Sequence, residues 1–82
     1  MSFGPPDDVE THARRADLHL GRNELPAAAA ELEAVLRSRP DWSAALLNYG
    51  SVLLRMERDA EAEGALRRLL EIDAGEIGRA HV

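Results

Sequence analysis

The sequence predicts an all-α protein in which two helix-turn-helix hairpins stack as a short solenoid. Apolar residues recur at helical spacing between Leu46 and Leu54, stop at residues 56–59, and resume between Ala62 and Ile72. The two halves of the chain also match each other at an offset of 34 residues, without a gap. Identical apolar pairs at this offset include Ala28 and Ala62, Leu32 and Leu66, and Leu36 and Leu70.

The first hairpin is expected to follow a short N-terminal arm. Residues 1–8 contain two adjacent prolines, which disfavour helix, so we expect an extended arm there. Asp7 or Asp8 can then cap a first helix that runs to about Leu20. The turn is expected at Gly21 to Glu24.

The second helix is expected between Pro26 and about Ser38. Proline suits the first position of a helix, where its missing N–H costs nothing. A second proline, Pro40, cannot continue the helix and is expected to end it.

The second hairpin is expected to begin with Asp41 as the cap of the third helix. Its turn is predicted at Glu57 to Asp59, and the fourth helix begins at Asp59 or its neighbours. Gly75 is a natural C-terminal cap or a turn between repeats.

Gly50 lies in the middle of the predicted third helix. Glycine there costs roughly 1 kcal/mol relative to alanine, so it requires a packing reason. We expect the fourth helix to cross closely at this point and to bring Ala62, Ala65 and Leu66 against it.

The pattern resembles the tetratricopeptide repeat, a helical hairpin of 34 residues. Tyr49 and Gly50 stand at the family's Leu-Gly offset, Ala62 at its alanine and Leu66 at its large apolar site. The residues one period earlier fit the same register, in which Pro40 takes the place of the closing proline. The resemblance implies a right-handed solenoid domain at residues 9–82, divided into repeat one (9–42), repeat two (43–76) and a partial third helix or cap (77–82).

Composition narrows the function classes. The net charge of −5 leaves no basic stripe for phosphates, so nucleic acid is not the expected partner. The chain has no cysteine, and no apolar run approaches the ~20 residues of a membrane span. The N-terminal residues lack the pattern of a signal peptide, and a cytoplasmic protein without membrane contact is therefore expected.

No catalysis, cofactor or metal is expected. The sequence offers no convergent set of acid, base and nucleophile. His12 and His19 are seven residues apart, whereas zinc ligands on one helix are usually four apart. The alternation of acidic residues and alanine at 59–63 is typical of a solvated helix start.

The resemblance implies a non-catalytic module that binds a peptide or partner protein on the inner surface made by the first helix of each repeat. Asn48 matches the asparagine of members that clamp the C-terminal carboxylate of chaperone tails, but Ala13 and Asp17 replace other clamp residues. A generic peptide groove is the wider expectation. Its candidate contacts are Arg14, Asp17, Asn48, Ser51 and Arg55.

Trp42 has two interpretations at this stage. It can staple the entry of the third helix against its next turn, or it can be an exposed anchor for a partner.

The alternative function is structural: self-association as a homodimer, or assembly as the N-terminal arm of a larger protein. Two repeats are fewer than the three or so that a stable stack usually needs. The last long helix would then keep an uncovered apolar stripe. The candidate self-association residues are Leu66, Leu69, Ile72, Ile77 and Val82.

Overall fold

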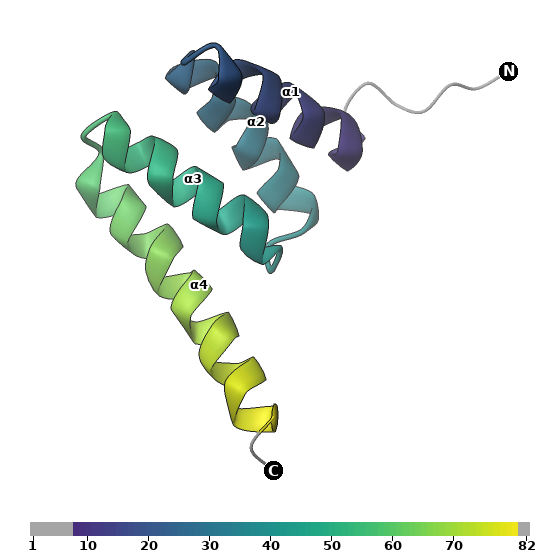
Figure 1. The fold of residues 1–82 in the computed structure, drawn as a ribbon, viewed down its shortest axis with the longest axis vertical. Coiled ribbons are helices and arrows are strands. Elements are labelled where there is room, and N and C mark those ends of the chain that lie inside the picture. The colour runs from purple at the N-terminus through teal and green to yellow at the C-terminus, as the bar shows by residue number, and fades with distance from the viewer. Residues whose placement is uncertain (1–7, 81–82) are drawn as a thin grey trace, which may run out of the picture.

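The computed structural model describes residues 8–80 of the chain, and side chains as far as residue 73. Within that range it contains α-helices and no strand. The helices are α1 (Val9–Gly21), α2 (Leu25–Ser38), α3 (Ser43–Arg55) and α4 (Asp59–Ala80). They form two hairpins, α1 with α2 and α3 with α4, and each helix packs mainly against its neighbours in sequence (Figure 1). The all-α prediction is confirmed. The expected arm lies outside the described residues except for Asp8, which has an extended backbone.

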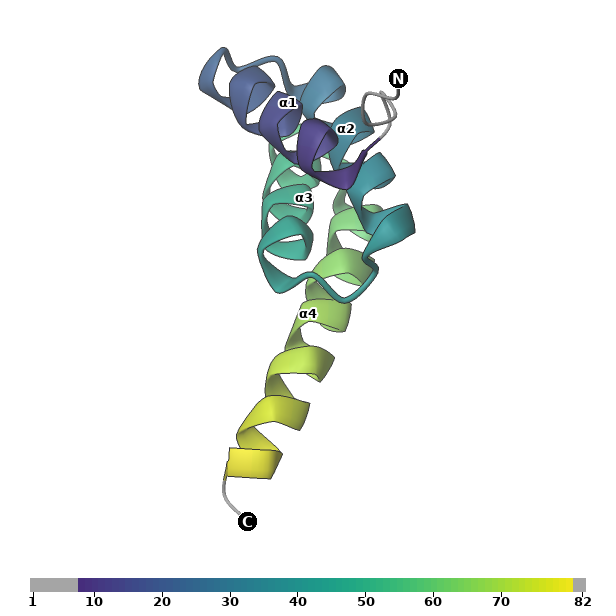
Figure 2. The ribbon, with the colours of Figure 1, turned by 90° about the vertical axis from the view of Figure 1, so that its right-hand side faces the viewer.

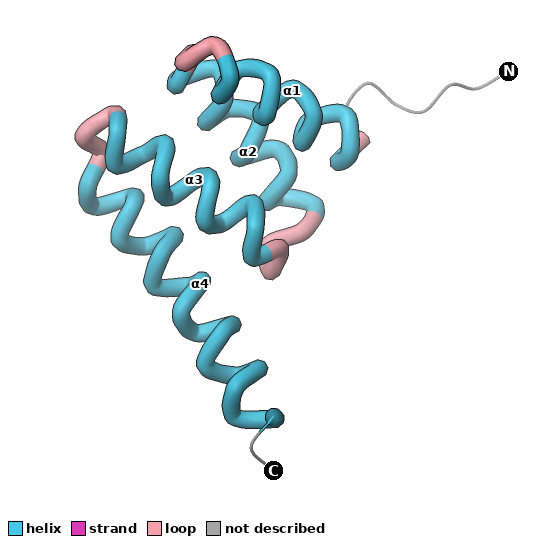
Figure 3. The backbone as a smooth tube through the Cα atoms, in the orientation of Figure 1, coloured by secondary structure: helices cyan, strands magenta, loops and turns pink. Residues whose placement is uncertain are grey.

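Both hairpins turn in the same way, through three residues between the helices (Figure 3). Asn23 and Glu57 occupy equivalent positions 34 residues apart, and both have a positive φ, 59° and 61°. In each turn the next residue donates its backbone N–H to a helix carbonyl: Glu24 to His19 at 2.8 Å, and Arg58 to Leu53 at 2.9 Å. The repetition seen in the sequence therefore extends to the backbone conformation of the turns.

The connection between the hairpins differs from the prediction at one residue. The N-cap of α3 is Trp42, not Asp41, and no side chain caps the helix. Asp41 instead accepts a hydrogen bond from Arg68 of α4 at 3.0 Å. The carboxylate is thus used to join α4 to the connection between the hairpins.

The core lies around α2, which contacts both α1 and α3. The residues that α2 buries are small or aliphatic, and Ala16 of α1 and Ala45 and Val52 of α3 complete the cluster. Small side chains allow the helix backbones to approach closely, while Trp42 and Tyr49 pack against the edge of this cluster. The buried residues of α2 are Ala28, Ala29, Leu32 and Val35.

The crossing of α3 and α4 at Gly50 is confirmed. A Cβ atom added to Gly50 would lie 2.7 Å from Cδ2 of Leu66. Ala62 and Ala65, the two alanines expected at this crossing, are also buried. Glycine is therefore required here by the close approach of a leucine side chain.

The predicted turn at Gly75 is wrong, because α4 continues through it to Ala80. A single glycine weakens a helix without ending it, and no proline follows in α4. The C-terminal half of α4 projects beyond the other three helices (Figure 2). No helix in the described range combines the length and the hydropathy required to cross a bilayer.

Candidate partner-binding site

A small groove lies between the first helices of the two hairpins. Residues of α1 and α3 form its walls, and Leu32 and Val35 of α2 form its floor. Its volume is about 140 Å³. The wall residues are Ala13, Asp17, Ala44, Ala45 and Asn48, with Trp42 at one end. We call this feature the α1–α3 groove.

Small residues keep the α1–α3 groove open. Ala13 on α1 and Ala44 on α3 have only a methyl group each, so the two helices leave a hollow above α2. Trp42 closes one end, packed against the core and half-buried. The guanidinium of Arg39 lies over its ring, 5.1 Å from the centroid. A cation over an aromatic face is attracted to the ring, so this contact helps to hold Trp42 in place.

The structure brings two of the five predicted contact residues into this groove. Asp17 and Asn48 line it from opposite helices. Arg14 and Ser51 are exposed, and neither is among the groove's lining residues. Arg55 donates a hydrogen bond to the side-chain oxygen of Asn23, which fixes the end of α3 to the first turn.

The two histidines join α1 to the start and middle of α2. His12 Nδ1 lies 2.5 Å from Glu31 Oε1, and His19 Nδ1 lies 2.6 Å from Glu24 Oε1. Their partners are therefore carboxylates of the second helix and its approach. Among the described residues, no three His, Cys, Asp or Glu side chains form a cluster that could hold a metal ion.

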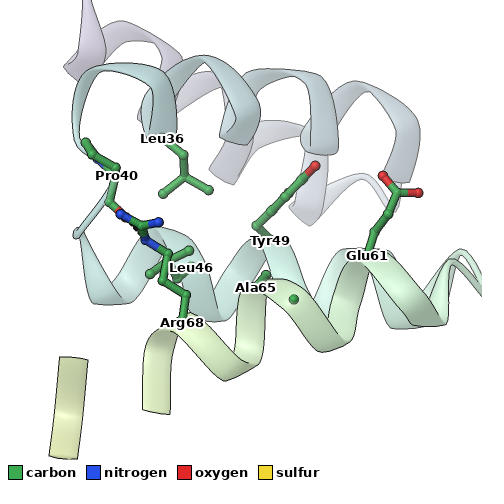
Figure 4. Close-up of a pocket in the computed structure, with 8 residues that line it drawn as sticks. Leu36, Pro40, Leu46, Tyr49, Glu61, Ala65 and Arg68 are labelled. Carbon is green, nitrogen blue, oxygen red and sulfur yellow. Dashed lines mark hydrogen bonds between the residues drawn. The ribbon is translucent and has the colours of Figure 1, made fainter. Parts of the chain in front are cut away.

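A larger hollow, of about 400 Å³, lies on another face, between α2 and α4 (Figure 4). Its apolar lining includes Leu36 and Pro40 from the first repeat, and Leu46 and Ala65 from the second. We call it the α2–α4 groove. Apolar spacing within single segments does not predict this groove, although a glycine inside the fourth helix, at position 64, is a signal for it.

Opposite charges stand at the two ends of the α2–α4 groove (Figure 4). At one end Arg68 donates to the Pro40 carbonyl at 3.1 Å and to Asp41. At the other end Tyr49 donates its hydroxyl proton to Glu33 Oε2 at 3.1 Å, near Glu61. Burial, followed by the hydrogen bond to Glu33 and the negative charges nearby, raises the pKa of Tyr49.

Arg58 neutralises one of these carboxylates. Its guanidinium donates two hydrogen bonds to Glu61, at 2.7 and 2.6 Å. The hydrogen bond from Arg58 lowers the pKa of Glu61.

The second repeat exposes positions that the first repeat covers. Leu32 is 3% exposed, whereas Leu66, its equivalent, is half-buried. Leu36 is half-buried, whereas its equivalent Leu70 is 68% exposed. A hollow of about 400 Å³ lies there, and we call this surface the end face; it is lined by Leu54, Asp59, Glu63, Leu66, Arg67 and Leu70.

The five residues predicted to mediate self-association do not lie on one surface in the described part of the structure. Leu66 belongs to the end face and also covers Gly50, while Leu69 and Ile72 are half-buried on α4. Ile77 lies in α4 beyond the described side chains, and Val82 lies outside the described residues.

Comparison with known proteins agrees with the helical hairpins of the structure. The family model of the tetratricopeptide repeat matches residues 13–77. The chain belongs to the tetratricopeptide repeat family. This membership supports a role in protein–protein interaction at the level of the family.

Two curated relatives share the repeat region. DnaJ homolog subfamily C member 3 of Rattus norvegicus is 34% identical over 73 residues, and that of Homo sapiens is 32% identical over the same length. Each match covers 89% of this chain and 14% of the relative. The chain therefore spans about one seventh of the length of these relatives. No solved structure gives a significant match.

Proposed function

We propose that this tetratricopeptide repeat module binds a segment of a partner protein, without catalysis, in the α1–α3 groove. The observation that supports this proposal is the hollow between the first helices of the two repeats, with Asp17 and Asn48 on opposite walls. The groove has an apolar floor and few polar groups, which is the usual composition of a ligand site.

The polar groups suit an extended peptide. The amide of Asn48 can donate to a backbone carbonyl and accept from a backbone N–H of the same segment. Asp17 can accept a hydrogen bond from a backbone N–H or from a basic side chain. Its negative charge would repel the C-terminal carboxylate of a chaperone tail. We therefore propose an internal peptide segment as the ligand, in preference to a chaperone tail. Trp42 supplies an apolar wall for one side chain of the segment.

Substitution of Asn48 tests the proposal. A peptide selected from a displayed library against the intact chain serves as the ligand, and its affinity is measured by calorimetry. Asn48→Ala is expected to weaken binding roughly tenfold, about 1.4 kcal/mol, through loss of its hydrogen bonds. Glu71→Ala, at an exposed position of α4, is the control and should leave the affinity unchanged. Equal affinities for the wild type and Asn48→Ala would reject the groove as the site.

Arg14, Ser51 and Arg55 are proposed contacts on the basis of their repeat positions alone. If the selected peptide has acidic residues outside the groove, charge reversal at both arginines should weaken its binding and increase the effect of salt. Unchanged binding of an acidic peptide to Arg14→Glu combined with Arg55→Glu would remove these residues from the site.

A second candidate function is self-association through the end face. The observation in its favour is the exposure of Leu54 and Leu70 at positions whose first-repeat equivalents are half-buried. Each large aliphatic side chain removed from water contributes roughly 1.5–3 kcal/mol, so a symmetric homodimer is a simple way to cover this surface. A role as the assembly arm of a longer protein would use the same surface.

Sedimentation equilibrium distinguishes the two candidates. If the chain forms a homodimer, the mass at micromolar concentration should be twice the chain mass of 9.0 kDa. The variant Leu70→Glu should then have the mass of the monomer. Leu18→Glu is the matched control, because Leu18 is an exposed leucine on α1. A mass of 9.0 kDa at every concentration would reject self-association and leave the peptide site unaffected. The cytoplasmic location remains a prediction.

A further inference from the structure

We infer that the α2–α4 groove is a second docking site, which accepts a large apolar side chain of a partner protein together with an adjacent basic side chain. This site lies on a different pair of helices from the α1–α3 groove and involves none of the residues proposed for that site. Its volume, about 400 Å³, falls within the range of about 300–1,000 Å³ that is typical of ligand sites.

Gly64 is the first observation that indicates a ligand there. It lies within α4 and lines the groove. A Cβ atom added to Gly64 would meet nothing within 4 Å, whereas one added to Gly50 would collide with Leu66. Glycine within a helix is unfavourable, and no packing against the described part of the chain explains it at position 64. A side chain at this position would occupy the groove, so the glycine keeps the groove open.

Charge identifies the chemistry of the occupant. Glu61 lines one end, and Glu33 lies next to that end, bonded to the hydroxyl of Tyr49. Arg58 pairs with Glu61 and also interacts with the charge of Glu33, so these three side chains together carry one net negative charge. Glu33 accepts the hydrogen bond from Tyr49 but forms no ion pair among the described residues. The opposite end holds Arg68, which is already paired with Asp41. A basic side chain is therefore favoured at the end near Glu33, while the apolar lining around Leu36, Leu46 and Ala65 accepts an adjacent apolar side chain.

The direct test uses a minimal probe, the N-acetylated and C-amidated dipeptide of phenylalanine and arginine. We expect saturable shifts of the backbone amide signals of Leu46, Gly64 and Ala65 when ¹⁵N-labelled protein is titrated to millimolar probe. The dipeptide in which glutamate replaces arginine should bind at least threefold more weakly. Absence of saturable shifts at these amides, or equal affinities for the two dipeptides, would overturn the inference.

Gly64→Leu separates a docking role from a structural one. Leucine has a higher helix propensity, so this variant is expected to raise the Tm by roughly 4–8 °C while it abolishes the probe shifts. A more stable protein that no longer binds cannot owe the loss to unfolding. Probe binding that survives in Gly64→Leu would overturn the inference.

A matched pair of charge variants completes the experiment. Glu33→Gln retains an acceptor for Tyr49 but removes the charge, and it should weaken the arginine dipeptide at least threefold. Glu63→Gln makes the same change on the end face, where Glu63 pairs with Arg67, and should have no effect. Equal weakening by both variants would show a general charge effect and contradict the assigned site. Asn48→Ala should leave the probe affinity unchanged, which keeps this test independent of the α1–α3 groove.

Discussion

At the scale of single residues, two helical glycines have different roles. Gly50 has no side chain because Leu66 occupies the space next to it. A Cβ atom at Gly64 would meet nothing within 4 Å, and this glycine lines the α2–α4 groove. The first glycine is therefore explained by folding and the second is not, and substitution should affect stability in opposite directions.

Gly50→Leu is expected to destabilise the protein by about 1–3 kcal/mol, because the added side chain must displace Leu66 from the crossing of α3 and α4. Urea unfolding measures the change in free energy. Gly64→Ala is the control and should increase stability through helix propensity. A neutral result for Gly50→Leu would mean that the close approach at this crossing is not required.

Tyr49 should make stability depend on alkaline pH. Its pKa is raised in the folded protein above the ordinary value of 10.0, so the folded state holds this proton more tightly than the unfolded chain does. The resulting stabilisation is fully present below that value and is lost as the pH rises through the folded pKa. The Tm of the wild type should therefore decrease more steeply with rising pH than the Tm of Tyr49→Phe, between about pH 9 and about pH 11. Parallel curves would exclude the effect of Tyr49.

At the scale of the elements, the two turns have a left-handed backbone conformation at the same position, but a different amino acid occupies it in each turn. Asparagine, at position 23, tolerates a positive φ, whereas glutamate, at position 57, does so poorly. The second turn therefore holds strain that the first turn avoids.

Glu57→Asn should relieve that strain and stabilise the protein by up to about 1 kcal/mol. The denaturation midpoint in urea measures this change, with an unchanged slope showing that the folded state is the same. Glu57→Gln is the control, because it removes the same charge but tolerates a positive φ no better than glutamate does. A lower midpoint for Glu57→Asn would contradict the assignment of strain to residue 57.

The sequence predicted the helices and their pairing, because apolar spacing and the 34-residue offset are local and repeated signals. Repeat position also placed Asp17 and Asn48 on the surface between the first helices, where both line the α1–α3 groove. Their role in binding stays a prediction. The turn predicted at Gly75 was wrong, because α4 continues to Ala80. A glycine permits a helix to end but does not by itself end it. The cap assigned to Asp41 failed because the carboxylate pairs with Arg68, a partner 27 residues away. The α2–α4 groove depends on helices from different repeats, whose spacing is not encoded in any one segment.

At the scale of the whole molecule, two hairpins offer three distinct surfaces. The α1–α3 groove lies between first helices, the α2–α4 groove lies between second helices, and the end face is the side of repeat two with exposed leucines. Stability in such a stack is approximately a sum of terms for each repeat and for the interface between neighbours. Binding at the grooves uses the interface between repeats, so it is expected to stabilise the stack as a unit.

A structure of the complex between this chain and a library-selected peptide tests the central proposal most directly. The peptide is expected to lie extended in the α1–α3 groove, with the side-chain amide of Asn48 bonded to its backbone and one side chain against Trp42. A peptide bound at the end face or in the α2–α4 groove, with the α1–α3 groove empty, would contradict the proposed function.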